Sequence, residues 1–146
     1  MSWTGDISRM GHLADRVADL AEVPSRASAA IAGDLEGLIQ DEFDAGTDPY
    51  GQPWKALAPA TVARGRTAPP LTDTGAMRAS AHVRPMRPAG VALSIDHPAA
   101  PHQTGWSGPQ GTGPARPILP ARSELPPDWQ DVIADRVEAE FKRGAA

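Results

Sequence analysis

The chain is organised around FDAGTDPYGQPWKALAPAT, which runs from Phe43 to Thr61. A long helical pattern leads into this stretch and ends in it. The segment Asp48-Pro49-Tyr50-Gly51 then has the composition of a tight turn, because Asp can accept backbone hydrogen bonds, Pro fixes φ and Gly leaves the exit unrestricted. Trp54 and Leu57 follow. We therefore predict a corner at which a helix ends, the chain reverses and Trp54 is buried in the core.

The length and composition of the chain favour a single domain. Its 146 residues suit one modest core, and its 16 prolines and 14 glycines indicate long loops. The absence of cysteine excludes disulfides and thiolate metal sites. No leader is recognisable and no apolar run approaches the roughly 20 residues that span a bilayer, so we expect a soluble protein made in a cytoplasm. We expect residues 1–146 to form one domain, with residues 1–23 as a semi-independent arm.

The charges are distributed unevenly along the chain. Residues 1–54 carry three basic and ten acidic side chains, residues 55–122 carry eight and two, and residues 123–146 carry three and six. This partition predicts a surface on which the acidic helix of one copy meets the basic middle of the next. Direct nucleic-acid binding is disfavoured because the basic residues are spread out and few aromatics accompany them. The residues expected at the contact between copies are Asp34, Glu36, Asp41, Arg78, Arg84 and Arg87.

Three long helices are predicted from apolar periodicity. The first spans residues 6–22, with Asp6 as its N-cap. The second spans about 25–45, after an interruption at Val23-Pro24, and stops at Gly46. Its acids Asp34, Glu36, Asp41, Glu42 and Asp44 are expected to face solvent or a partner. The last helix begins at about Pro127 and buries one apolar stripe formed by Trp129, Val132, Ile133, Val137 and Phe141.

The middle of the chain is predicted to hold short elements. We expect short helices at residues 59–64 and just after Thr74, and a single hairpin over residues 81–95. Residues 96–113 are expected to form a long loop, mobile in the isolated protein and ordered by a neighbour. Together these elements predict an α+β fold with two N-terminal helices, a small antiparallel sheet with long loops, and a C-terminal helix packed on the sheet.

One short segment is similar to a catalytic motif. Asp73-Thr74-Gly75 followed by Ala resembles the active-site turn of retroviral-type aspartic proteases. Such enzymes are nearly all β, whereas this chain has extensive helical patterns and no apolar strand entering the turn. His97 and His102, with Asp96 beside them, are too few for a defined metal site. We therefore assign no catalytic, metal-binding or cofactor-binding residue and expect no enzymatic activity.

Four motifs in order resemble the phage virion morphogenesis family, which contains tail-completion proteins of Mu-like contractile-tailed phages. The first is the corner from Asp48 to Trp54, with Leu57. The second is Leu71-x-Asp73-Thr74-Gly75-x-Met77, the third is His102-Gln103-x-Gly105, and the fourth runs from Pro114 to Leu119. The chain departs from the family pattern in a short segment between the first two motifs and in the approach to the third. The signature residues are Asp48, Pro49, Gly51, Trp54, Leu57, Asp73, Thr74, Gly75, His102, Gln103, Gly105, Arg116 and Pro117.

The resemblance implies a structural virion protein with no catalytic residues. It would complete the tail of a phage or tail-like particle, as a neck or tail-terminator ring at the head–tail junction. Its partners would be further copies of itself, as a hexamer matching the six-fold tail, and tail-tube, sheath or head–tail connector proteins. It would be assembled in the host bacterial cytoplasm and located in the virion. The alternatives left open are a protease-like enzyme acting through Asp73 and a DNA-packaging accessory protein.

Overall fold

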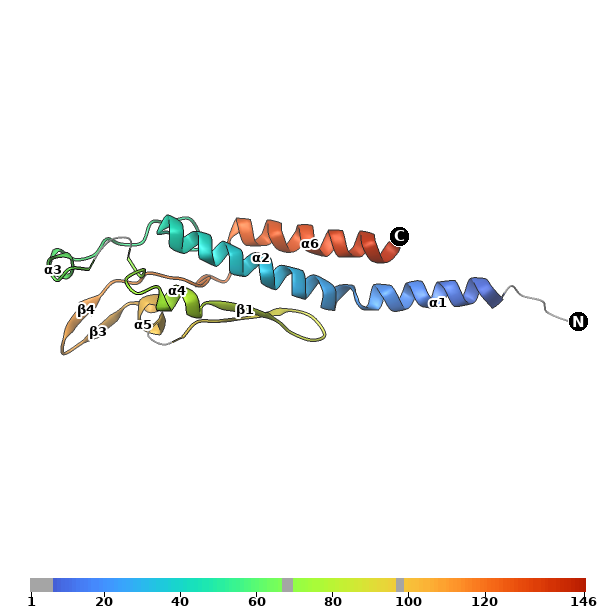
Figure 1. Ribbon diagram of the computed structural model, residues 1–146, viewed down its shortest axis with the longest axis horizontal. Helices are drawn as coiled ribbons and strands as arrows, with labels where there is room; N and C mark the ends of the chain where they lie inside the picture. Colours follow the sequence, from blue (N-terminus) through green and yellow to red (C-terminus); the bar gives the residue numbers. More distant parts are fainter. Residues whose placement is uncertain (1–6, 67–69, 97–98) are drawn as a thin grey trace, which may run out of the picture.

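The computed structural model describes residues 7–66, 70–96 and 99–146, with side chains described from Ala14 onward. The molecule is a rod in which helices α1 (Ile7–Ala21) and α2 (Val23–Ala45) follow one another almost end to end. Helix α6 (Pro127–Ala145) lies along α2, residues 76–94 line the opposite side, and the other short elements lie toward the end of the rod that is remote from α1 (Figure 1). None of the described helices combines the length and apolarity that a membrane span requires.

Helix α2 is the central element because it is buried from two sides. Its apolar residues recur at helical spacing, and Leu35, Ile39 and Phe43 are at most 1% exposed. Pro24 falls in the first turn, where its missing N–H breaks no intrahelical bond, so the helix begins at Val23 and not after the proline. The helix ends at Gly46, as predicted, with φ of 69° and its N–H donated to the Glu42 carbonyl.

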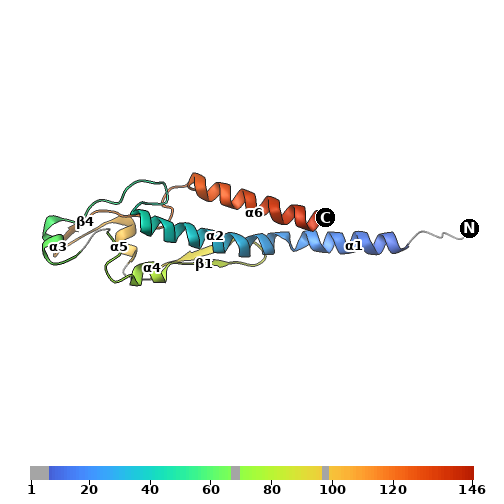
Figure 2. The same ribbon diagram turned by 45° about the horizontal axis from the view of Figure 1, so that its top comes forward.

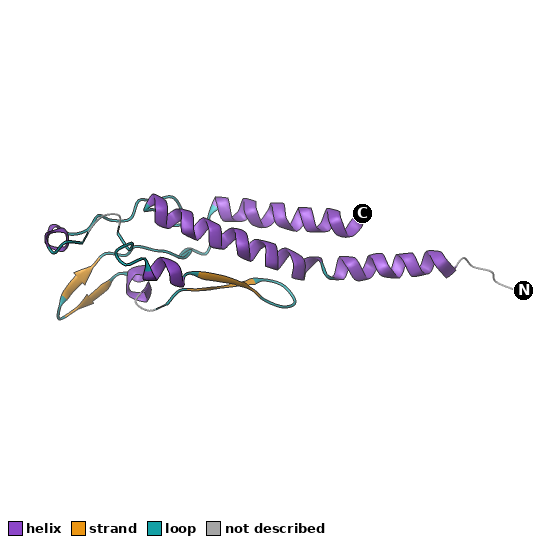
Figure 3. Cartoon of the chain, viewed as in Figure 1, coloured by secondary structure: helices purple, strands orange, loops and turns teal. Residues whose placement is uncertain are grey.

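A hairpin covers the side of α2 opposite α6. Strands β1 (His82–Pro85) and β2 (Val91–Ser94) pair antiparallel, with Val83 opposite Leu93. Val83 is buried against the α2 core, and the turned view in Figure 2 keeps the hairpin beside α2. The predicted hairpin over residues 81–95 and the α+β class are therefore confirmed, and Figure 3 shows the helices and strands side by side.

Helix α6 does not bury the whole stripe predicted from its sequence. Trp129 is 2% exposed, but Val137 and Phe141 are 45% and 57% exposed. The helix is rotated so that Arg136, Glu140 and Gly144 face α2 instead. Gly144 is needed for this approach, since a Cβ there would lie 3.1 Å from Cγ2 of Val23. The prediction was thus wrong for the C-terminal half of the helix.

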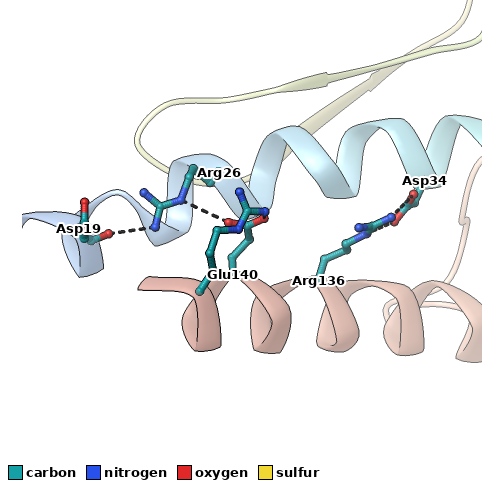
Figure 4. A network of polar contacts seen from close by, with 6 residues as sticks. Asp19, Arg26, Asp34, Arg136 and Glu140 are labelled. Carbon is teal, nitrogen blue, oxygen red and sulfur yellow. Dashed lines mark hydrogen bonds and ion pairs between the residues drawn. The ribbon is translucent and has the colours of Figure 1, made fainter. Parts of the chain in front are cut away.

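Ion pairs also join α6 to α2 (Figure 4). Arg136 makes a two-pronged contact with Asp34, with 3.1 Å between Nη2 and Oδ1. Nε of Arg26 lies 3.2 Å from Oε2 of Glu140, and the Glu140 side chain is almost fully buried. Arg26 also donates to the Asp19 carbonyl of α1, at 3.1 Å. This seam fixes the register of α6 along α2.

Residues 96–113 are not the long loop that the sequence predicts. Residues from Ala99 to Thr104 form helix α5, and strands β3 (Trp106–Gly108) and β4 (Gly111–Gly113) form a second hairpin. The positive φ of Gly111, 120°, makes the turn possible, and the Trp106 indole fills the space that a Cβ at Gly113 would occupy. The mobility of this segment in the isolated protein stays a prediction.

The shorter predicted helices are present. Helix α3 (Pro59–Ala63) begins with a proline, as expected, and helix α4 (Ala76–Ser80) follows the Asp73-Thr74-Gly75 turn. Helix α1 reaches α6 through Arg16, which donates to the Ala145 carbonyl at 3.0 Å. The predicted cap at Asp6 lies outside the described residues. A semi-independent arm formed by residues 1–23 stays a prediction.

The two-sided burial of α2 predicts a large cost for shortening its core side chains. Leu35→Ala should lower the free energy of unfolding by about 2–5 kcal/mol, because a cavity remains between α6 and the hairpin. Urea unfolding of the purified protein measures this loss. The control is Leu125→Ala, at a position 42% exposed, which should cost less than about 1 kcal/mol. Equal costs at the two positions would contradict the description of the core.

Candidate functional site

The corner after α2 forms as the sequence predicts. Oδ1 of Asp48 accepts hydrogen bonds from the backbone N–H groups of Tyr50 and Gln52, both at 2.9 Å. Gly51 has φ of 79°, a left-handed value that glycine adopts without strain. The backbone N–H of Trp54 donates to the Gly46 carbonyl at 2.9 Å, which closes the corner onto the end of the helix. Side-chain and backbone bonds therefore hold the reversal together.

Trp54 is the anchor of the corner. Its side chain is buried and packs edge-on against Phe43, with 5.5 Å between the ring centroids. Its Nε1 donates to the Pro117 carbonyl at 2.8 Å. The predicted burial of Trp54 is confirmed, and the hydrogen bond connects the first motif to the fourth across 63 residues of chain.

Arg116 forms a second connection between these motifs. The residue is only 7% exposed, and its guanidinium donates to two backbone carbonyls of the corner. The distances are 2.7 Å from Nε to Lys55 O and 2.9 Å from Nη2 to Ala56 O. The Arg116 guanidinium therefore holds the corner loop through two backbone carbonyls.

Gln103 makes the third connection. Its Oε1 accepts from the backbone N–H groups of Ile118 and Leu119, at 2.9 and 3.0 Å, and its Nε2 donates to the Leu119 carbonyl at 2.6 Å. Gly105 is required beside it, because its φ is 77° and a Cβ there would lie 3.0 Å from backbone atoms of Gly113 and Ala115. The third motif thus docks onto the fourth through the Gln103 side chain and through the close approach of the backbone at Gly105.

His102 lies in the same region, half-buried. Its carbonyl accepts from the Arg116 N–H at 2.6 Å, while its Nδ1 is buried without a hydrogen-bond partner among the described residues. Burial lowers the pKa of its imidazole, and the charge of Arg116 adds to this effect. The imidazole is therefore held in its neutral form, as a packing group.

The Asp73-Thr74-Gly75 motif starts a helix. Asp73 is exposed and forms an ion pair with Arg66, while Oγ1 of Thr74 accepts from the Ala76 N–H at 3.3 Å. Helix α4 then presents Arg78 to α2, where its Nε donates to Gln40 Oε1 at 2.7 Å and its Nη2 to Asp44 Oδ2 at 2.9 Å. The motif fastens a loop to the side of α2, and its aspartate faces a cation in place of a second carboxylate.

The residues predicted to lie between copies divide into two groups. Within the chain, Asp34 binds Arg136, Arg78 binds Asp44, and Glu36 accepts from the Val83 N–H at 2.9 Å. The second group consists of Asp41, Arg84 and Arg87. Their side chains are exposed and make no hydrogen bond or ion pair with another described residue.

Glu42 contradicts the prediction that the α2 acids face outward. It is 8% exposed and packs under Trp129, whose Nε1 donates to Oε1 at 3.3 Å, while Oε2 has no partner among the described residues. Burial raises the pKa of Glu42 to about 8; the Trp129 hydrogen bond opposes the shift, and Asp48 and Asp41 add to it. Its spacing from Leu35 and Ile39 could have revealed this burial, since all three share one helical face.

The comparison with family models matches residues 6–142 to the phage virion morphogenesis family. This range includes all four motifs and nearly the whole described fold. No curated protein and no solved structure matches the chain.

The burial of Trp54 predicts a large effect of its removal. Trp54→Ala should lower the free energy of unfolding by about 3–5 kcal/mol, because it leaves a cavity beside Phe43 and frees the Pro117 carbonyl. Trp54→Phe retains a ring against Phe43 and loses the hydrogen bond, so its cost should be smaller, about 1–2 kcal/mol. Thermal unfolding measures both. An unchanged melting temperature for the alanine variant would contradict the anchor role.

The raised pKa of Glu42 predicts a pH dependence of stability. Between about pH 4.5 and 8 the folded state keeps the Glu42 proton and the unfolded state releases it, so stability falls as pH rises through this window. Glu42→Gln should remove that contribution and be more stable than the wild type above pH 8, by roughly 3–5 kcal/mol. Urea unfolding at pH 5, 7 and 9 measures the difference. Parallel stability curves for the two proteins would contradict a protonated, buried carboxyl.

Proposed function

Because the chain belongs to the phage virion morphogenesis family, we propose that it is a structural protein that completes the tail of a phage or tail-like particle. In this proposal it forms a neck or tail-terminator ring at the head–tail junction of a contractile tail. It is assembled in the host bacterial cytoplasm and stays in the virion. Its neighbours there are tail-tube, sheath or head–tail connector proteins.

The structural role is supported by the hydrogen-bond partners of the signature side chains. Asp48, Gln103 and Arg116 direct their hydrogen bonds to backbone groups of the same chain. Catalytic side chains need free atoms directed at a bound substrate. Side chains that bind the backbone of their own chain support a scaffold role, in which loops are held in one shape for contact with other proteins.

The rod shape and the charge partition support a head-to-tail ring. Unlike surfaces at two places on one molecule form heterologous contacts, which close into a ring when the rotation between copies divides the circle. A six-fold tail tube would template a hexamer. Exposed charge pairs contribute only about 0–1 kcal/mol each, so the ring is expected on the tail and not in dilute solution.

Charge reversal on the hairpin tests the proposed ring. Arg84→Glu combined with Arg87→Glu should leave the purified protein folded, because both side chains are exposed, yet give unfinished, non-infectious tails. Electron microscopy and infectivity of the particles measure the outcome. The control, Arg64→Glu with Lys142→Glu, makes the same change of net charge at exposed positions outside the hairpin and should give normal particles. Fully functional particles from the hairpin variant would contradict the ring.

A further inference from the structure

An acidic pocket lies where α2 ends and α6 begins. Its volume is about 230 Å³, and it is lined by carboxyl groups from three segments of the chain. Asp41 and Glu42 come from the last turns of α2, Asp48 from the corner and Asp128 from the first turn of α6. None of the described residues that line it is a lysine or an arginine.

The pocket has unused hydrogen-bonding capacity. Glu42 is more than nine-tenths buried, and its Oε2 has no partner among the described residues. The side chains of Asp41 and Asp128 form no ion pair with any described residue. A carboxyl buried in this way costs stability, and an uncharged side chain of the same size would fold more favourably. The arrangement is therefore better suited to binding a cation than to holding the fold.

The spacing of the acids favours an organic cation over a metal ion. Among the described residues no three His, Asp or Glu side chains are close enough together to coordinate one metal. A guanidinium is larger, planar and carries five N–H donors, so it can reach the Asp41 and Asp128 carboxylates together. Its positive charge also favours release of the proton from the Glu42 carboxyl, which can then accept a hydrogen bond.

The hairpin turn carries an arginine suited to this pocket. Arg87 is exposed and unpaired with any described residue, and it lies beside Glu22 and Ser25 at the start of α2. The pocket lies at the other end of the same helix, whose 23 residues span about 34 Å. That distance is far beyond the reach of a side chain, so Arg87 cannot enter the pocket of its own chain. Figure 1 shows the β1–β2 turn beside the start of α2, at the opposite end from the corner.

We propose that the acidic pocket at the end of α2 receives the Arg87 side chain of a second copy of this chain. Because the pocket and the arginine lie at opposite ends of α2, the contact joins copies head to tail and can repeat around a ring. The inference rests on the proposed ring and specifies which surfaces form it. Lys55 and Arg122 are also basic, but they lie near the same end of α2 as the pocket. A contact through either residue would join two copies by the same end and not head to tail.

Cysteine cross-linking tests the contact, since the chain has no cysteine of its own. Ala45→Cys places a thiol at the pocket and Ala89→Cys places one at the hairpin turn, and neither removes a charge. Particles assembled with the double variant are treated with diamide, which oxidises two nearby thiols to a disulfide. We expect a ladder from dimer to the complete ring on non-reducing gels. The matched control pairs Ala89→Cys with Ala139→Cys on the exposed side of α6 and should give no ladder.

A further substitution distinguishes this contact from mere proximity. Adding Arg87→Glu to the cross-linking pair should reduce the ladder at least tenfold in concentrated purified protein, whereas adding Arg64→Glu should leave it unchanged. Assembled particles that contain the protein but give no ladder, or give the same ladder with the control pair, would overturn the contact and leave the proposed function standing. Wild-type particles that lack the protein would overturn the proposed function, and the contact with it.

Discussion

The burial of α2 between α6 and the β1–β2 hairpin is the constraint on which the rest of the structure depends. The molecule is a narrow rod, and α2 runs between the other two layers (Figures 1 and 2). Apolar side chains of α2 such as Leu35 and Ile39 form the centre of the hydrophobic core. Three elements are placed by how they reach α2: α6 through its ion pairs, the hairpin through Val83, and α4 through Arg78.

Loops with few apolar residues are held by polar side chains that bind the backbone. Gln103, Arg116 and Trp54 together donate to or accept from backbone groups of two separate segments, residues 55–56 and 117–119. Each such bond contributes only about 1 kcal/mol net, but a buried partner left unsatisfied costs more. This explains why a chain rich in proline and glycine keeps a defined shape at the end of the rod, where the apolar core is thin.

The electrostatics make the two ends of α2 different. Pairing within the chain neutralises Asp34, Asp44 and Arg78, so part of the charge partition visible in the sequence is used within the fold. Unpaired acids remain around Glu42 at one end of α2, and unpaired arginines remain on the hairpin. A molecule with complementary ends is suited to repeated head-to-tail assembly.

The sequence by itself determined the features that depend on near neighbours along the chain. Helix periodicity, the glycine at position 46 and the Asp48 turn were sufficient to predict α2, its end and the corner, because each is set within a few residues. The tertiary structure alone decided the rotation of α6, and with it the exposure of Phe141 and the burial of Glu42 under Trp129. It also decided the second hairpin, whose glycines the composition had marked only as loop. These outcomes depend on contacts between residues far apart in the chain, such as the 87 positions separating Glu42 and Trp129. The helical spacing indicates the face of α2 that carries Glu42, but it does not indicate which residue covers that face.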